Sequence, residues 1–338
     1  MAEDTQPIAQ PIPQPIPSPE AHRMSGAPTQ DHTDPTRHPE PARRAAVPAT
    51  AALLAATAVW GSTFVVTKDS VDELAPASFL TWRFGIAAAA LLLVRPTTLR
   101  DLARTDLWRA SGLGVFLAAG FLLQTTGLLH TLAGVSGFLT GAAVILTPLV
   151  AALLFSERVG RSGWLAVGLS ALGLAALTGG VSAPSALGAL LTLGGAAFFA
   201  LHITGLSQWA SRENAYALTA VSVTTAALLC ALVAGLTGGV TAPATSSTWS
   251  AVVYLGVVAT CIGFGVQAWA QSALSATTAA VVMTMEPVFA AGLAFALGER
   301  GIGPWGWVGG MLVVAGMAFS ELGPRRCCDA MSPRIECC

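Results

Sequence analysis

Long blocks of apolar residues, separated by short polar connections, make up most of this chain. Because an α-helix rises 1.5 Å per residue, about 20 apolar residues cross the ~30 Å hydrocarbon layer of a membrane. Blocks of this length predict ten transmembrane helices, at residues 49–67, 78–94, 110–129, 133–155, 163–180, 186–208, 216–236, 250–271, 275–298 and 304–321. Charged residues are only 10% of the chain, against about 25% in soluble domains, which excludes a soluble globular protein.

The two ends of the chain differ in composition from the apolar blocks. Eleven of the twenty prolines lie in the first 48 residues, where aliphatic residues are sparse. A segment of this kind cannot bury enough apolar surface to offset its chain entropy. We therefore expect residues 1–46 to be a disordered, proline-rich cytoplasmic tail and residues 323–338 to be a cytoplasmic C-terminal tail.

The positions of lysine and arginine predict the orientation, since cytoplasmic loops carry an excess of these residues. With the N-terminus inside, the cytoplasmic segments hold eleven of them, against two outside, Lys68 and Arg300. The eleven are Arg43, Arg44, Arg95, Arg100, Arg104, Arg109, Arg158, Arg161, Arg212, Arg325 and Arg326. We therefore expect a multi-pass protein of the plasma (inner) membrane with both termini in the cytoplasm.

The chain contains an internal repeat. Residues 124–158 and residues 267–300 both begin with glutamine, carry a proline within the span and end in Glu-Arg. These shared residues at corresponding positions favour a duplication over chance similarity between Ala- and Leu-rich helices. We expect two five-helix repeats, at residues 47–182 and 183–322. Because five is odd, the second repeat starts on the opposite side of the membrane, so the two repeats are inverted.

Short motifs mark both repeats: Trp-Gly-Ser-Thr-Phe at 60–64, Trp-Arg-Phe at 82–84, Gly-Phe-Leu-Thr-Gly at 137–141, Glu-Pro-Val-Phe at 286–289 and Gly-Glu-Arg at 298–300. With these motifs, residues 50–321 resemble the EamA branch of the drug/metabolite transporter superfamily. The resemblance implies an all-α integral membrane protein, with ten transmembrane helices arranged as two inverted five-helix EamA repeats. It also implies a central cavity and the export of small metabolites.

Glu286 is the first candidate for a transport site. It lies about eleven residues, or about 16 Å, into its predicted span, near the middle of the membrane. An ionisable side chain there costs about 2.5–3.5 kcal/mol on insertion scales, so such residues are rare and usually face a cavity. Pro287 removes a backbone donor and kinks the helix, which frees a carbonyl at the same depth. We expect Glu286 to exchange a proton; the alternative is a permanently protonated carboxyl bonded between helices.

Arg83 is the second candidate, about six residues or about 9 Å from the outer end of its predicted span. One interpretation places the guanidinium among the outer headgroups by snorkelling. The other places it in the cavity, where it binds an anionic group or pairs with Glu286. Both alternatives are compatible with the sequence.

Uncharged residues complete the expected cavity. Gln124 and Gln267 occupy matching positions in the two repeats, where cavity polarity and interhelical hydrogen bonding are equally good explanations. Trp60 lies near mid-span, which is unusual for an interfacial tryptophan, so we expect it to form a wall of the cavity. Thr147 and Pro148 are included in the same expected site.

Other residues of the spans are expected to serve the architecture. His130 and His202 lie toward the ends of their spans, which favours interfacial histidines over proton relays. Glycines let helices approach closely. We expect this role for Gly112, Gly114, Gly168, Gly173, Gly309 and Gly310.

These features favour a secondary active transporter over other classes of membrane protein. The chain has no Gly-x-x-x-x-Gly-Lys-Ser/Thr segment, so ATP hydrolysis within it is not the energy source. The spans hold no HExxH, no GxSxG and no paired aspartates, so we expect neither an enzyme nor a metal site, and no cofactor.

The sequence thus predicts export of small organic metabolites, amino-acid-like compounds or drugs, by proton-coupled alternating access. A proton-independent facilitator stays open as the alternative, with a membrane-embedded enzyme far behind it. The expected partners are a small-molecule substrate, the lipid bilayer and protons, with a homodimer as an open option and no nucleic acid.

Overall fold

A computed structural model describes residues 40–98, 102–131, 133–157, 159–177, 185–296 and 304–322. Every regular element within these ranges is a helix. The part of the predicted disordered tail before residue 40 and the predicted C-terminal tail lie outside the described residues.

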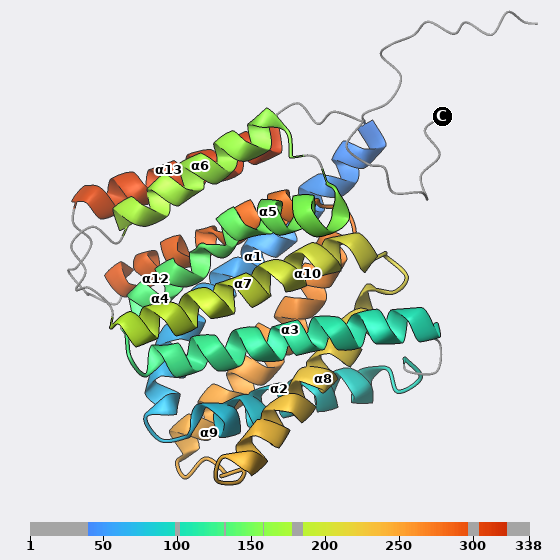
Figure 1. Cartoon of the computed structure of the whole chain (residues 1–338), viewed down its shortest axis with the longest axis vertical. Helices are drawn as coiled ribbons and strands as arrows, with labels where there is room; N and C mark the ends of the chain where they lie inside the picture. Colours follow the sequence, from blue (N-terminus) through green and yellow to red (C-terminus); the bar gives the residue numbers. More distant parts are fainter. Residues whose placement is uncertain are drawn as a thin grey trace, which may run out of the picture. The chain divides into compact units, whose positions relative to one another are not determined.

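The helices follow the order of the expected spans (Figure 1). The first half contains α1 (Glu40–Val71), α2 (Pro76–Val94), α3 (Arg104–Leu128), α4 (Ala133–Gly141), α5 (Ala143–Phe155) and α6 (Arg161–Leu177). The second half contains α7 (Ala186–Trp209), α8 (Ala215–Leu236), α9 (Ser246–Tyr254), the π-helix η1 (Leu255–Ile262), α10 (Gly263–Gln271), α11 (Ala276–Met283), α12 (Met285–Ala296) and α13 (Pro304–Leu322).

The length and apolar character of these helices suit a membrane. In hydrocarbon the backbone N–H and C=O groups must pair within their own segment, so spanning segments of this composition are helical. Six of the described helices are long and apolar enough to span: Ala46–Val71, Pro76–Val94, Arg104–Leu128, Ala186–Trp209, Ala215–Leu236 and Ser246–Gln271. Leu139–Phe155, Ala276–Ala290 and Trp307–Gly316 are shorter apolar stretches. The all-α membrane architecture is confirmed, while the number of ten spans stays a prediction.

Helix α1 begins earlier than the sequence suggested. Its first residue is Glu40, inside the range expected to be a disordered tail, and Pro48 lies within the helix. Pro41 is tolerated because it stands in the first turn, where a missing N–H breaks no intrahelical bond. Ala46 and Ala49 are buried in a cluster with apolar residues of α7, α10 and α11. This packing against the second half extends the helix beyond what local composition predicts.

Two expected spans are interrupted at matching places in the two halves. Helix α4 gives way to α5 at Ala142, and α11 gives way to α12 at Thr284. The Thr284 N–H donates to the carbonyls of Ala280 and Val281, each at 3.2 Å, so the backbone stays paired through the break. Irregular backbone at membrane depth is tolerated where it is buried in protein or lines a cavity. The two breaks therefore indicate where a site lies.

The pattern of contacts between helices is the same when the two halves of the chain are exchanged. Helix α2 packs against α8, and α6 packs against α13 (Figure 1), and each pair consists of corresponding helices. Helix α1 packs against α10 and α12, while its counterpart α7 packs against α3 and α5. The contact of α3 with α8 is likewise matched by the contact of η1 with α2. The duplication seen in the sequence is thus present in the packing.

Glycines make two of these contacts close. A Cβ on Gly114 of α3 would lie 2.5 Å from a carbonyl oxygen of α8, and one on Gly173 of α6 would lie 2.7 Å from a carbonyl oxygen of α13. Gly112 and Gly168 have no atom within 4 Å of that position. The expectation of close helix approach is therefore confirmed for Gly114 and Gly173. It is wrong for Gly112 and Gly168, which face open space.

A carboxylate between α1 and α2 caps the N-terminus of α9. Glu73 Oε1 accepts from the backbone N–H groups of Ala244 and Thr245, the latter at 3.2 Å. Glu73 Oε2 accepts from the hydroxyls of Thr245, at 3.0 Å, and Thr248. The bond from Thr248 and the bond from the Ala244 N–H lower the pKa of Glu73 below its ordinary value. A helix N-terminus also favours negative charge. Since Glu73 belongs to the first half and α9 to the second, this contact joins the two halves of the chain.

We expect acid to weaken this cap. A group with a lowered folded-state pKa contributes stability that is complete above its unfolded-state pKa and is lost as the pH falls through the folded-state value. The Tm of the wild-type protein in detergent should therefore fall as the pH drops below about 4.5. Glu73→Gln should have a lower Tm at pH 7 and a flatter acid dependence. The exposed neighbour provides the control Asp72→Asn, which should behave like wild type; equal profiles for wild type and Glu73→Gln would contradict the cap.

Candidate functional site

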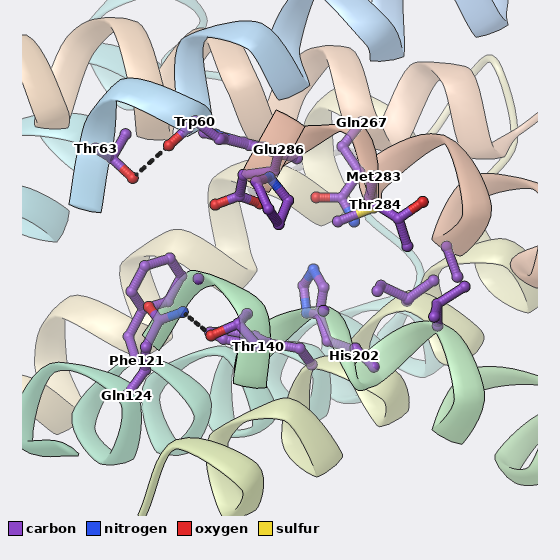
Figure 2. A pocket seen from close by; sticks show the side chains of 18 of the residues that line it. Trp60, Thr63, Phe121, Gln124, Thr140, His202, Gln267, Met283, Thr284 and Glu286 are labelled. Atoms are coloured by element: carbon purple, nitrogen blue, oxygen red, sulfur yellow. Dashed lines mark hydrogen bonds between the residues drawn. The ribbon is translucent and has the colours of Figure 1, made fainter. Parts of the chain in front are cut away.

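The helices around the two breaks enclose a cavity. It holds about 750 Å³ of atom-free space, including the part open to solvent. Figure 2 shows Trp60, Glu286 and Gln267 on one side of this space and Gln124 and His202 on the other. Because the lining comes from both halves, a movement of one half against the other changes the cavity.

Arg83 of α2 lies in the lining of the cavity and does not snorkel to the headgroups, since it is only 2% exposed. Its Nε donates to Thr260 Oγ1 at 2.9 Å, and its Cζ lies 4.6 Å from the ring centroid of Phe121, within cation–π range. Among the described residues no carboxylate oxygen lies within 4.0 Å of the guanidinium. Its terminal nitrogens have no hydrogen-bond partner in the same part of the chain. Arg83 therefore offers unpaired donors to a ligand.

Glu286 lines the same cavity from the first turn of α12. The residue is partly exposed. Pro287 also lines the cavity, and as a proline it cannot donate to the carbonyl of Met283, four residues earlier. A Cβ on Gly61 would lie 3.0 Å from the Glu286 carbonyl oxygen, so α1 lies directly against the start of α12.

Trp60 of α1 is held by the π-helix η1. Its Nε1 donates to the carbonyl of Ala259 at 2.8 Å, and a Cβ on Gly263 would lie 2.8 Å from the same nitrogen. The hydroxyl that accepts from Arg83 belongs to Thr260, the next residue of η1. Irregular π-helical turns occur frequently at functional sites. Here one such segment positions two cavity side chains from two different helices.

Gln124 and Gln267 both line the cavity, from the corresponding helices α3 and α10. Gln124 Nε2 donates to Thr140 Oγ1 at 2.8 Å (Figure 2). Gln267 is fully buried, and its Nε2 donates to Gln271 Oε1 at 2.8 Å. The two explanations left open by the sequence therefore both apply: these side chains make hydrogen bonds and give the cavity polarity.

The sequence interpretation missed His202 and most of the aromatic lining. His202 was expected at a membrane interface, but it is 3% exposed and lines the cavity. It lies seven residues, or about 10 Å, before the end of α7, about as deep as the 9 Å expected for Arg83. Its depth in the span was therefore a signal in the sequence that could have identified it. Phe121 lies with its ring centroid 5.1 Å from that of Phe199 and 6.0 Å from that of Phe264, and all three line the cavity.

Thr147 and Pro148 do not line the cavity. The Thr147 hydroxyl donates to the carbonyl of Ala143 at 2.7 Å within α5, and its own carbonyl lies 3.5 Å from the Thr204 hydroxyl of α7. Thr147 is fully buried in this contact between helices. The structure thus places Thr147 in helix packing, and of the two prolines only Pro287 of the second half lines the cavity.

The lining supplies a cation, an acid, amides and aromatic surface to a ligand. Within the described ranges no group of three or more His, Cys, Asp or Glu is placed to hold a metal ion. A guanidinium and a carboxyl more than 4.0 Å apart suit a ligand that carries both charges. The aromatic rings suit an apolar portion of the same ligand.

Comparison with known proteins gives matches over most of the chain. The profile of the EamA-like transporter family matches residues 48–179 and 186–321. An uncharacterized transporter of Archaeoglobus fulgidus is 26% identical over 284 residues, which are 78% of this chain and 82% of that protein. A probable terminal-alkyne amino-acid exporter of Streptantibioticus cattleyicolor is 30% identical over 302 residues, 83% of this chain and 96% of that protein. A solved crystal structure at 21% identity has the same fold, with a TM-score of 0.66 over 83% of this chain and 99% of that one.

We expect Gly263→Ala to disturb the cavity wall and Gly265→Ala to leave it intact. The added methyl group meets Trp60 Nε1 at 2.8 Å in the first variant and has nothing within 4 Å in the second. Overpacking costs about 1–3 kcal/mol, whereas alanine in a helix is better than glycine by up to about 1 kcal/mol. The Tm in detergent should fall for Gly263→Ala and stay equal or rise for Gly265→Ala. Equal Tm values for the two variants would contradict the contact.

Proposed function

Because the chain belongs to the EamA-like transporter family, we propose that it exports small, amino-acid-like metabolites by alternating access of its central cavity. The family and the relatives named as transporters make the protein a membrane transporter and not an enzyme. The family suggested by the sequence motifs is thereby confirmed. The name of one relative, an amino-acid exporter, supports the choice of substrate class.

The observation that carries the substrate class is the unpaired guanidinium in the cavity. Arg83 is buried, and no carboxylate of the described residues lies within 4.0 Å of it. The terminal nitrogens of its guanidinium have no hydrogen bond to the described residues, and a planar carboxylate pairs with a guanidinium through two parallel hydrogen bonds. A substrate carboxylate therefore supplies the missing partner. Glu286, in the same cavity, provides an acid for a substrate ammonium or for a proton.

The proposed topology has ten spans in two inverted repeats. Six of these spans are the long helices, two are the interrupted spans α4–α5 and α11–α12, and the last two are α6 and α13. The two-fold exchange of helix contacts supports repeats of equal architecture. An odd number of spans in each repeat inverts one against the other, as in other secondary transporters built around a midplane site. We place both termini in the cytoplasm and the protein in the plasma membrane, on the arginine distribution; a homodimer stays a prediction.

Proton coupling is the proposed energy source. A carboxyl open to a cavity between two mobile halves can bind a proton on one side of the membrane and release it on the other. The break at Thr284 lies two residues before Glu286, so movement at this point changes the surroundings of Glu286. A proton-independent facilitator is the alternative, and it requires no titration of this side chain.

Arg83→Gln should weaken recognition of carboxylate substrates. Loss of a charge-assisted bidentate pair is expected to raise the half-saturating concentration at least tenfold, about 1.4 kcal/mol or more. The measurement is uptake of L-amino acids into inside-out vesicles. Thr260→Val removes only the hydroxyl that orients the guanidinium and should give a smaller rise. An Arg83→Gln protein with wild-type Tm and wild-type half-saturation would contradict the role of Arg83.

Glu286→Gln should separate coupling from transport. The amide cannot exchange a proton, so accumulation driven by a pH gradient is expected to disappear, while exchange of substrate across proteoliposomes without a gradient continues at saturating substrate concentration. Asp72→Asn, which changes an exposed acid outside the cavity, should keep both activities. Undiminished gradient-driven accumulation by Glu286→Gln would favour the facilitator.

A further inference from the structure

Two buried polar atoms in the cavity lining have no hydrogen-bond partner among the described residues: His202 Nε2 and Gln267 Oε1. Leaving such an atom unpaired costs free energy, so each usually has a partner in the working protein. Both belong to the cavity of the proposed transport site. The identity of the missing partner follows from whether each atom donates or accepts.

His202 Nε2 is an acceptor. Its other ring nitrogen, Nδ1, lies 3.1 Å from the carbonyl oxygen of Leu113. A carbonyl only accepts, so Nδ1 carries the hydrogen atom. A doubly protonated ring would place an unpaired cationic N–H in the interior, which is more costly than an unpaired lone pair. The neutral ring therefore presents its Nε2 lone pair to the cavity.

Gln267 Oε1 is an acceptor as well, because a chain of hydrogen bonds sets the orientation of its amide. Gln271 Nε2 donates to the Ile203 carbonyl at 2.8 Å, which leaves Gln271 Oε1 to accept. Gln267 Nε2 donates to that oxygen at 2.8 Å. The remaining atom, Gln267 Oε1, is left without a partner.

The two acceptors face each other across the cavity. His202 comes from α7 and Gln267 from α10, two helices in contact. Figure 2 shows the imidazole pointing into the space toward Gln267, with Glu286 labelled on the same side as Gln267. The cavity thus has an acceptor end formed by these three side chains. Arg83 packs on the ring of Phe121 and His202 on the ring of Phe264, and the centroids of these two rings lie 6.0 Å apart, so aromatic surface connects the acceptor end with the guanidinium.

We propose that His202 Nε2 and Gln267 Oε1 form a subsite for the protonated amine of the substrate, with Glu286 as its counter-charge. An ammonium group has three N–H donors and no acceptor, which matches three acceptors around one space. The subsite selects compounds that carry an amine as well as a carboxylate. It rests on the proposed function and adds the requirement for the amine.

The test compares three compounds with the same five-carbon chain: L-norvaline, 5-aminopentanoate and pentanoate. The full-length protein in proteoliposomes should accept at least one of the two amines with a half-saturating concentration at least about tenfold below that of pentanoate. Equal half-saturation for pentanoate and both amines would overturn the subsite and leave the proposed exporter standing. If none of these compounds and none of the standard amino acids is transported, the proposed function itself fails.

A matched pair of variants identifies the atoms. His202→Asn keeps a donor for the Leu113 carbonyl but removes the acceptor at the Nε2 position, whereas His202→Gln keeps an acceptor there. The preference for the amine, measured as the ratio of the half-saturating concentrations of pentanoate and the amine, should fall about tenfold or more in His202→Asn and in Gln267→Met, and should be largely kept in His202→Gln. An unchanged amine preference in both His202→Asn and Gln267→Met would overturn the subsite and indicate that a water molecule pairs with these atoms.

Discussion

The contact of the Arg83 guanidinium with Thr260 and Phe121 is the interaction on which the site depends. A cation at membrane depth costs at least about 2.5–3.5 kcal/mol, so the surrounding helices must supply polar or aromatic partners for it. The partner hydroxyl comes from η1, and the same π-helix accepts the hydrogen bond of Trp60. One irregular segment of the second half thereby holds α1 and α2 of the first half around the cavity. Glycines at 61 and 263 allow the close approach that this arrangement requires.

The duplication produces a symmetrical backbone and an asymmetrical cavity. Both halves interrupt the same span, at Ala142 and at Thr284, and both carry a proline shortly afterwards. The residue before the proline is Thr147 in the first half and Glu286 in the second. Thr147 bonds to its own helix, whereas Glu286 faces the cavity. The acid and the two unpaired acceptors therefore come from the second half, and the guanidinium comes from the first.

The sequence was sufficient to predict the helices and the charged part of the lining. The helices are predictable because spanning segments in hydrocarbon leave the backbone no other way to pair its polar groups. Arg83 and Glu286 were singled out because the cost of a charge at that depth leaves few alternatives to a cavity. Both of them line it, as do Trp60, Gln124, Gln267 and Pro287. Their roles in transport stay predictions until the variants are measured.

The remaining features depend on packing that local patterns do not carry. His202 was set aside because histidine is common at interfaces, and only the approach of Leu113 and Phe264 shows that its ring is buried. Thr147 and Pro148 were included in the expected site, but the Thr147 hydroxyl bonds within its own helix and its carbonyl accepts from Thr204 of α7. The early start of α1 at Glu40 depends on Ala46 and the second half of the chain. The π-helix has no sequence signal that we recognise.

The most direct test of the account is protection of the cavity by substrate. Met283 lines the cavity, and Met283→Cys in a background where the six native cysteines are serine places one thiol there. The rate of its reaction with a membrane-impermeant thiol reagent is measured with and without L-norvaline or another transported amino acid. Val240→Cys, 46% exposed in the α8–α9 connection, is the control. We expect the amino acid to slow labelling of Met283→Cys and to leave Val240→Cys unaffected. Equal labelling of Met283→Cys with and without a transported amino acid would show that this cavity is not the substrate site.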